Sequence, residues 1–228
     1  MPKGIRRMKI LYWIVLWIIL TLTMLPFDQS IHSWVWTSPK GLLRDVLTAN
    51  DYLSGYPIHL FIISILFAQS NWKKLLSGYL AVMIGQGLVV DLIKILVGRG
   101  RPLMEKGAFY FHPFSPPRME MTSFPSGDAT AALALATLLG IYYPKSKWLF
   151  WLLALGSGLS RIARGRHFPS DVIFGAGLGV ACAVFATHLF GASYYSFGLN
   201  QTDALNQSLE VGNWKPTPAP EVVSWKIS

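Results

Sequence analysis

The sequence predicts an all-α fold, a polytopic membrane helical bundle of about six transmembrane helices. Composition is the first reason: 52% of the 228 residues are hydrophobic and only 14% are charged, whereas soluble domains carry about 25% charged residues. The mean hydropathy of +0.40 is the second reason. The third is that the apolar residues gather into six segments, and a bilayer-spanning helix needs about 20 of them in a row.

The six expected helices follow one another along the first 190 residues. They cover about 10–27, 56–70, 75–97, 124–143, 147–160 and 171–190. The first, third, fourth and sixth are long enough to span, whereas the second and fifth are short, so an odd number of spans stays open. Basic residues before the first segment also fit a signal peptide, but no small-residue cleavage site follows, and we expect an uncleaved first span.

The remaining segments define the expected domain organisation. Residues 28–55 are expected to form an outside loop with a short helix at the membrane interface. Residues 1–190 form one membrane-embedded domain, and 191–228 form a polar C-terminal tail on the cytoplasmic side. No second soluble domain is expected.

The charge pattern indicates an orientation and an anion site. Four basic residues precede the first span and two short loops carry Lys pairs, which predicts a cytoplasmic N-terminus. The basic residues on the opposite side concentrate in two loops, after the third and fifth spans, which indicates that these loops bind an anion. The net charge of +9 lies between apolar spans rather than on one soluble domain, so we expect no nucleic-acid partner. The single cysteine, Cys182, excludes an intrachain disulfide and Cys-rich zinc spacings.

Three polar stretches fall at the outer ends of the expected spans and are therefore expected to meet. They are "KILVGRGRP" (94–102), "PSGD" (125–128) and "SRIARGRHFPSD" (160–171). Lys94, Arg101 and Arg161 offer charged donors that suit one phosphate group.

Ser126 and Gly127 stand at the start of the fourth span. A helix N-terminus offers free backbone N–H groups and the positive end of a dipole, which suits phosphate. Taken alone, Ser126 is more simply read as an N-cap.

His167 and Asp171 are four residues apart, near the start of the sixth span. A carboxylate bonded to one imidazole nitrogen fixes the tautomer and leaves the other nitrogen free to attack. Such a pair alone is weak evidence. Its position directly after Arg161, Arg164 and Arg166 gives it weight as a nucleophile and its orienting acid.

The combination resembles a known family signature. Its parts are Lys-x6-Arg-Pro (Lys94, Arg101, Pro102), Pro-Ser-Gly (Pro125 to Gly127) and Ser-Arg-x5-His-x3-Asp (Ser160, Arg161, His167, Asp171). This order is similar to that of the type 2 phosphatidic acid phosphatase (PAP2) family, shared with bacterial membrane lipid phosphatases, non-specific acid phosphatases and vanadium haloperoxidases. The motifs cover 94–171, and the span pattern of about 10–190 is similar to the membrane branch.

The resemblance implies a mechanism. His167 would attack phosphorus and form a phospho-histidine, Asp171 would hold His167, and water would hydrolyse the intermediate. The residues implied to bind the phosphate oxygens are Lys94, Arg101, Ser126, Gly127 and Arg161. The phosphatase branch requires no metal or other cofactor.

The resemblance also implies the setting of the reaction. The substrate would be a membrane lipid phosphate, such as phosphatidic acid, phosphatidylglycerol phosphate, a polyprenyl diphosphate or a lipid A phosphate. From the small size and simplicity of the chain, we expect an integral protein of a bacterial inner membrane. The charge pattern of the loops predicts that the site faces the periplasm or exterior. The sequence predicts no oligomeric state.

Asp128 departs from the family pattern, which usually has histidine at this position to protonate the leaving group. A free aspartic acid has a pKa of about 3.9 and is mostly ionised at neutral pH. Three arrangements therefore stay open: Asp128 is the acid, His112 in the same outside loop supplies the proton, or the leaving group needs little help, as with a diphosphate.

Other readings of the same residues stay open as well. The site could transfer phosphate to a lipid alcohol, or the protein could bind lipid phosphates with weakened catalysis; a haloperoxidase is disfavoured because that chemistry belongs to soluble members. Arg99, Arg164 and Arg166 could bind a second phosphate or headgroup, or simply the lipid surface.

Overall fold

The structure, a computed structural model, describes residues 3–37, 41–42, 45–46, 49, 56–69, 72–114 and 118–190. Its α-helices are α1 (Lys3–Met24), α2 (Asp28–Thr37), α4 (Tyr56–Phe67), α5 (Trp72–Val97), α6 (Gly127–Tyr142), α7 (Lys147–Ala163) and α8 (Pro169–Phe190). Short 3₁₀ turns cover Leu25–Phe27, Pro102–Met104, Met119–Met121 and Pro144–Ser146. Within the described ranges the only β pairing is an isolated bridge between Arg99 and Phe111. The all-α prediction is confirmed.

The described residues all belong to one compact unit, Met1–Gly191. Each of the six expected apolar segments corresponds to one helix of this unit, and the helix expected between 28 and 55 is present as α2, which contacts α7 and α8. The expected polar tail, 191–228, lies outside the described residues, as does most of the loop between α2 and α4.

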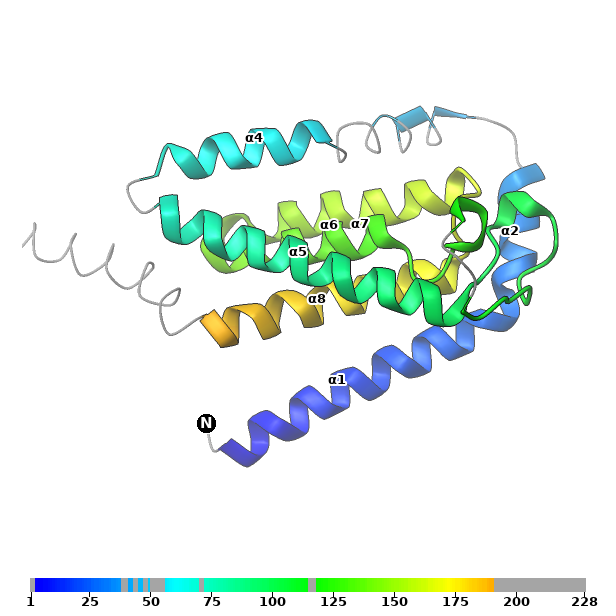
Figure 1. The fold of residues 1–228 in the computed structure, drawn as a ribbon, viewed down its shortest axis with the longest axis horizontal. Coiled ribbons are helices and arrows are strands. Elements are labelled where there is room, and N and C mark those ends of the chain that lie inside the picture. The colour runs from blue at the N-terminus through cyan, green and yellow to red at the C-terminus, as the bar shows by residue number, and fades with distance from the viewer. Residues whose placement is uncertain are drawn as a thin grey trace, which may run out of the picture. The chain divides into compact units, whose positions relative to one another are not determined.

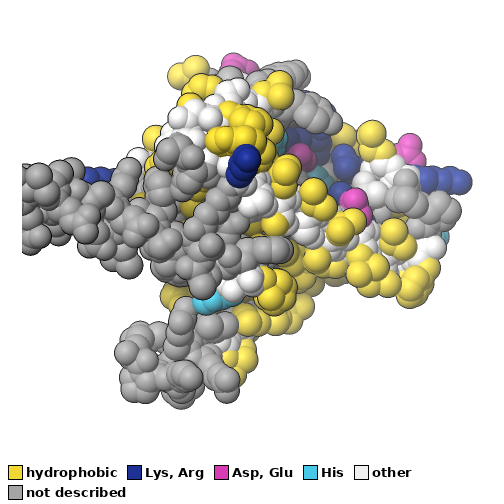
Figure 2. Space-filling view, turned by 60° about the vertical axis from the view of Figure 1, so that its left-hand side comes forward, with side chains coloured by type: hydrophobic (Ala, Val, Ile, Leu, Met, Phe, Trp, Pro, Cys, Tyr) yellow, Lys and Arg dark blue, Asp and Glu magenta, His cyan; other side chains and the backbone are white. Residues whose placement is uncertain are grey.

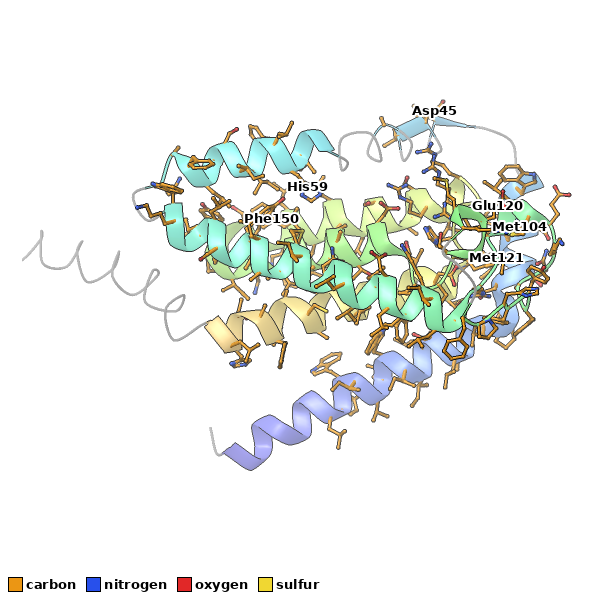
Figure 3. The ribbon with its side chains drawn as sticks, viewed as in Figure 1. Asp45, His59, Met104, Glu120, Met121 and Phe150 are labelled. Atoms are coloured by element: carbon orange, nitrogen blue, oxygen red, sulfur yellow. The ribbon has the colours of Figure 1, made fainter. Side chains whose placement is uncertain are left out.

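Helix α6 is the centre of the bundle and contacts α5, α7 and α8, which run alongside it (Figure 1). Its buried Leu133 and Ala136 pack with Ala154 of α7. α4 lies against α5, where Nδ1 of His59 is 2.6 Å from the hydroxyl of Tyr79 (Figure 3). Helix α6 is therefore surrounded by α5, α7 and α8, and α4 lies outside it against α5.

Small residues bring α8 close to α6. A Cβ added at Gly175 would lie 2.6 Å from the carbonyl oxygen of Ser126, and one added at Gly179 would lie 2.2 Å from that of Thr130. This Gly-xxx-Gly spacing lets two helix backbones approach closely, as in many membrane helix pairs. The first turn of α6 is therefore fixed against the N-terminal half of α8.

Helix α1 docks on the other side of α8. The indole nitrogen of Trp17 donates to the carbonyl oxygen of Ile173 at 3.1 Å, and its ring packs against Phe174 with centroids 4.8 Å apart. Gly177 leaves room for this ring, because an added Cβ would lie 2.2 Å from the indole nitrogen. The start of α8 thus has α6 on one face and α1 on another.

Among the residues that the structure describes, three helical stretches are long and apolar enough to cross a membrane: Leu11–Trp36, Leu75–Val97 and Pro169–Leu189. Ile58–Phe67 and Gly127–Tyr142 are shorter apolar helices. Large hydrophobic side chains are exposed along these elements, for example Leu88 and Phe185, and hydrophobic side chains cover much of the face in Figure 2. Exposed apolar surface of this extent marks contact with lipid or partners.

Candidate functional site

The three polar stretches meet at one end of the bundle, as the sequence predicts. The C-terminal ends of α5 and α7 and the N-terminal ends of α6 and α8 lie together there (Figure 1). Backbone hydrogen bonds join them: Ser123 N donates to Arg99 O at 3.0 Å, and Ser126 N donates to Asp171 O at 3.1 Å. Residues 24 and 45 positions apart in the sequence are therefore neighbours.

The chain between α5 and α6 folds back over this end. Gly98 has φ +57° and takes the carbonyl oxygen of His112 so close that a Cβ would lie 1.8 Å from it, so only glycine fits. Arg101 N donates to Glu120 O at 2.8 Å, which pairs the two 3₁₀ turns. Figure 3 shows Met104, Glu120 and Met121 together in this region.

His167 is buried and firmly oriented. Its side chain is 2% exposed, and Nδ1 lies 2.7 Å from the carbonyl oxygen of Ser123. A carbonyl oxygen only accepts, so Nδ1 carries the hydrogen and Nε2 keeps its lone pair in the neutral ring. The sequence predicted a direct hydrogen bond from His167 to Asp171, but Asp171 Oδ2 lies 4.0 Å from Nδ1, too far for one. The Ser123 carbonyl takes the place of the carboxylate as the partner of Nδ1.

The His167 ring is held in its neutral form. Burial lowers its pKa from 6.5 to about 3, with further lowering by the positive charges of Arg101, Arg161 and Lys94, against a rise from the Ser123 bond. A neutral imidazole has the lone pair that a nucleophile requires. The cations therefore surround a base that stays unprotonated at neutral pH.

Asp171 is fully buried and acts on His167 through Ser123. Its Oδ2 accepts from the Ser123 hydroxyl at 2.6 Å and from the Phe168 backbone N–H at 2.8 Å. Its Oδ1 accepts from Arg99 Nη1 at 2.5 Å. The carboxylate thus fixes both segments that flank the imidazole.

Arg99 is fully buried, so it cannot bind a headgroup or the lipid surface as the sequence allowed. Besides Asp171, its guanidinium donates to Asp28 at 2.7 Å and twice to the carbonyl oxygen of Ala108. Its Cζ lies 4.5 Å from the ring centroid of Phe168. Arg99 is a structural centre of the site rather than a ligand for substrate.

The remaining cations lie around His167 and partly face solvent. Lys94 Nζ is 3.7 Å from Asp91 Oδ1, and a Cβ added at Gly127 would lie 3.3 Å from that Nζ. Arg101 Nη2 donates to Thr122 Oγ1 at 3.3 Å. Figure 2 shows Lys and Arg side chains gathered with acidic and His side chains in a hollow on one face.

Arg101 has bonding capacity left inside the protein. Its Nε is buried, and none of the residues that the structure describes offers it a hydrogen-bond partner. Burial also lowers the pKa of Arg101, an effect that Asp128 opposes and Arg166 and Arg161 reinforce. An anion bound here would accept a hydrogen bond from Nε of Arg101 and would compensate the positive charge of its guanidinium.

Ser126 and Gly127 start α6 as expected. Ser126 is buried, and its Oγ accepts from the Ala129 backbone N–H at 3.4 Å, so the N-cap interpretation is confirmed. Gly127 is the first helical residue and brings the N-terminal end of α6 beside Lys94. The positive end of the α6 dipole and the Lys94 ammonium group therefore lie side by side, where both can attract the same anion.

Asp128 stands in the first turn of α6, at the edge of the cluster. Its side chain is 51% exposed, and Oδ2 is 3.3 Å from Nη1 of Arg161, which is almost buried. The other candidate acid, His112, is exposed, and its ring meets Tyr110 edge-on with centroids 4.8 Å apart. Of these two candidates, Asp128 contacts a predicted phosphate ligand, Arg161.

Sequence reasoning missed three residues of this arrangement: Asp28, Arg99 as a buried residue, and Ser123. An acid at the end of an apolar span, such as Asp28, was an available signal, because ionisable residues there are functional candidates. The role of Ser123 depends partly on its backbone carbonyl, which leaves no trace in the sequence. Among the described residues no group of three or more His, Cys, Asp and Glu side chains is arranged to hold a metal ion.

Comparison with known proteins places these features in context. The sequence model of the PAP2 superfamily matches residues 75–195. The lipid A 1-phosphatase of Rhizobium etli is 34% identical over 115 residues, which are 49% of each chain. That of Rhizobium johnstonii is 32% identical over 126 residues, 54% of this chain and 51% of the relative. The chain thus spans about half the length of these curated relatives.

Two solved structures share the fold. The crystal structure of Aquifex aeolicus LpxE superposes with a TM-score of 0.58 at 24% identity, over 71% of this chain and 95% of the other. The transmembrane PAP2-type phosphatidylglycerolphosphate phosphatase from Bacillus subtilis gives 0.57 at 24% identity, over 78% and 94%. The chain therefore shares its overall fold with these two proteins.

Proposed function

Because this chain belongs to the PAP2 superfamily and is an integral membrane protein, we propose that it is a lipid phosphatase. It removes phosphate from a lipid phosphomonoester or diphosphate through a phospho-histidine on His167. The observation that carries this proposal is the buried, neutral His167, held at Nδ1 by the Ser123 carbonyl and surrounded by Lys94, Arg101 and Arg161.

This arrangement suits phosphoryl transfer. Such a reaction needs an oriented nucleophile and fixed positive charge around the phosphoryl oxygens, and little other chemistry from the protein. The Nδ1–H tautomer leaves Nε2 as the attacking atom. Cations held in a partly buried site act more strongly than in water, because less solvent screens them.

In the first step, Nε2 forms a bond to phosphorus as the bond from phosphorus to the lipid oxygen breaks. Lys94, Arg101, Arg161 and the N-terminal end of α6 at Ser126 and Gly127 bind the phosphoryl oxygens. The electron pair goes to the leaving oxygen, which takes up a proton or, in a diphosphate, leaves as a phosphate ester anion.

In the second step, water attacks phosphorus and the phosphorus–nitrogen bond breaks. Inorganic phosphate leaves, the electron pair returns to Nε2, and one proton of the water passes to a base. His167 is then neutral again, ready for another substrate. Asp171 does not exchange protons in this scheme; it holds Ser123 and the start of α8 so that the imidazole stays in place.

Asp128 is the proposed proton carrier in both steps. Its half-exposed carboxyl group contacts Arg161, a phosphate ligand, and can exchange protons with solvent. An acid of low intrinsic pKa works best with a leaving group that needs little protonation. Asp128 therefore favours a diphosphate or another activated phosphate over a simple alkyl phosphate.

The proposed substrate remains in the bilayer while its headgroup reaches the cations. The apolar helices Leu75–Val97 and Pro169–Leu189 carry the site at their ends, so acyl or prenyl chains can stay in hydrocarbon. The relatives named lipid A 1-phosphatase and the fold neighbour named phosphatidylglycerolphosphate phosphatase support a lipid phosphate. We place the site on the periplasmic or exterior side of a bacterial inner membrane.

Phosphate release from a panel of lipids tests the proposal. Purified protein in detergent is given a lipid A phosphate, phosphatidic acid, phosphatidylglycerol phosphate and a polyprenyl diphosphate. Turnover of at least one that disappears in His167→Ala and persists in the exposed-histidine control His188→Ala supports a phosphatase. Label that moves from donor lipid to an added lipid alcohol identifies a phosphotransferase, and binding without turnover identifies a binding protein.

A further inference from the structure

Asp28 lies at the junction of the first helix and α2, yet its carboxylate reaches the start of α8. The side chain is fully buried. Its Oδ1 accepts from the Ser170 backbone N–H at 2.9 Å, and its Oδ2 contacts the Ser170 hydroxyl. An acid at a helix N-terminus satisfies free N–H groups and favours the dipole. Here the acid comes from a residue 142 positions away.

Arg99 joins Asp28 to Asp171. Its Nη2 donates to Asp28 at 2.7 Å and its Nη1 to Asp171 at 2.5 Å, and all three side chains are 0% exposed. Ser170 completes the group, because its hydroxyl also accepts from Arg99 Nη1 at 2.8 Å. We call these four residues, Asp28, Arg99, Ser170 and Asp171, the buried charge network.

One chain of contacts leads from the buried charge network to the nucleophile. Asp171 Oδ2 accepts from the Ser123 hydroxyl at 2.6 Å, and the carbonyl of Ser123 receives the Nδ1 hydrogen of His167 at 2.7 Å. Arg99 also holds the backbone of Ser123, since Ser123 N donates to Arg99 O at 3.0 Å. No contact links Asp28 or Arg99 to the phosphate ligands among those described.

We infer that Asp28 and Arg99 are positioning residues for the nucleophile: through Asp171 and Ser123 they fix the angle and tautomer of His167. The inference rests on the proposed function, since it concerns the same site. It also gives the first membrane helix a part in the reaction, because α1 and its continuation deliver Asp28 to the network.

The chemistry of the network explains why its geometry is fixed. A planar guanidinium can bind two carboxylates at once with separate nitrogens, whereas the lysine ammonium is a flexible point charge. Removing the guanidinium would leave two buried carboxylates without a counter-charge, whereas removing one carboxylate leaves the guanidinium paired with the other alone. In the observed arrangement the guanidinium and both carboxylates each have hydrogen-bond partners, and a small shift of a nucleophile lowers the rate of its reaction strongly.

Two variants of graded severity test the inference. Asp28→Asn removes one charge, and Ser170→Ala removes one hydroxyl. Their matched controls are Asp45→Asn, at an exposed carboxylate, and Thr137→Val, which removes a buried hydroxyl that donates to Leu133 O within α6. For each, kcat and KM are measured on the best lipid of the panel, together with inhibition by inorganic phosphate and the thermal midpoint.

We expect a loss confined to kcat. Asp28→Asn should lower kcat about 10- to 100-fold and Ser170→Ala about 3- to 10-fold, as a displaced reacting group does. KM and the inhibition constant of phosphate should stay within about twofold, because the oxygen ligands are untouched. The two controls should match the wild-type protein.

A ¹⁵N-histidine NMR spectrum supplies a readout that needs no turnover. In the wild-type protein the resonances missing from His167→Ala should report the Nδ1–H tautomer; in Ser170→Ala they should shift or show a second tautomer. If the His167 resonances and kcat both stay at their wild-type values, the inference is overturned. It is also overturned if kcat, phosphate affinity and the thermal midpoint all fall together while the resonances stay unchanged. If Asp28→Asn does not fold, Ser170→Ala decides alone. A wild-type protein without turnover refutes the proposed function instead, and the spectrum still tests the positioning.

Discussion

Nδ1 of His167 lies 2.7 Å from the carbonyl oxygen of Ser123. The backbone, and not a carboxylate, therefore sets the tautomer of the proposed nucleophile. Asp171 stands one step further away, because it accepts from the hydroxyl of the same Ser123 at 2.6 Å. Ser123 thus connects the buried charge network to the imidazole with its main chain and its side chain together.

Removing the Ser123 hydroxyl should therefore weaken catalysis more than substrate binding. Ser123→Ala deprives Asp171 Oδ2 of one donor and loosens the segment that carries the carbonyl. We expect kcat to fall about 10- to 100-fold with KM nearly unchanged, and the free energy of unfolding to fall by about 1–3 kcal/mol. Steady-state kinetics and thermal melts check this against Ser64→Ala, which removes an exposed hydroxyl that donates to Leu60 O within α4. A rise in KM at constant kcat contradicts the role given to Ser123.

His167 should remain neutral far below the usual histidine range. Its folded pKa of about 3 lies below the value of 6.5 in an unfolded chain. Only the unfolded form takes up this proton as the pH falls from about 6.5 towards 3, so stability decreases across that window, by about 2 kcal/mol at pH 5. A ¹⁵N-histidine NMR titration should show a neutral ring from pH 8 to about 4.5. A midpoint near 6.5 for His167 contradicts the burial argument.

Gly127→Ala should weaken phosphate binding without lowering the stability of the protein. The added Cβ would lie 3.3 Å from Lys94 Nζ, so the ammonium must shift, while alanine in a helix is favoured over glycine by up to about 1 kcal/mol. We expect phosphate inhibition to weaken about 3- to 10-fold, the loss of part of one charge-assisted hydrogen bond, with the thermal midpoint unchanged or higher.

The matched control is Gly87→Ala in α5, where nothing lies within 4 Å of an added Cβ. It should leave phosphate inhibition at the wild-type value. Equal phosphate affinity in both variants would show that Lys94 does not bind phosphate beside Gly127.

Asp128→Asn tests the proton carrier. The amide keeps the size of the side chain but cannot transfer a proton, so loss should depend on the leaving group. We expect hydrolysis of an alkyl phosphate lipid to slow about 100-fold or more and that of a diphosphate or aryl phosphate about 10-fold or less, within the usual range for general acid catalysis. Asp45→Asn serves as the control. Equal losses on both substrates argue that Asp128 acts only through its contact with Arg161.

Local patterns in the sequence predicted most of the fold. The six apolar segments became helices, and Ser126 before Gly127 correctly marked the start of α6, because an N-cap is a local hydrogen bond. The meeting of the three polar stretches was also predictable, since successive spans are antiparallel and all three stretches fall at the same expected end of them.

The supports of the site could not be predicted in the same way. Arg99 and Arg101 are two residues apart in one basic segment. Only packing decides that Arg99 is buried between carboxylates, while Nε of Arg101 has no hydrogen-bond partner among the described residues. Asp28 reaches Ser170 across 142 positions, a distance at which spacing carries no information. The prediction of a direct bond between Asp171 and His167 was wrong. The local His-x3-Asp spacing cannot show that Ser123, far away in the sequence, bonds to both side chains.

The central claim is that His167 carries the phosphoryl group, and trapping that intermediate tests it most directly. Protein mixed with a lipid bearing a ³²P-labelled terminal phosphate is quenched in alkali within one turnover and digested for mass spectrometry. The account predicts acid-labile, alkali-stable label on the peptide containing His167, lost on chase with unlabelled substrate and absent in His167→Ala. Turnover without label on the protein, or label on another residue, would contradict it.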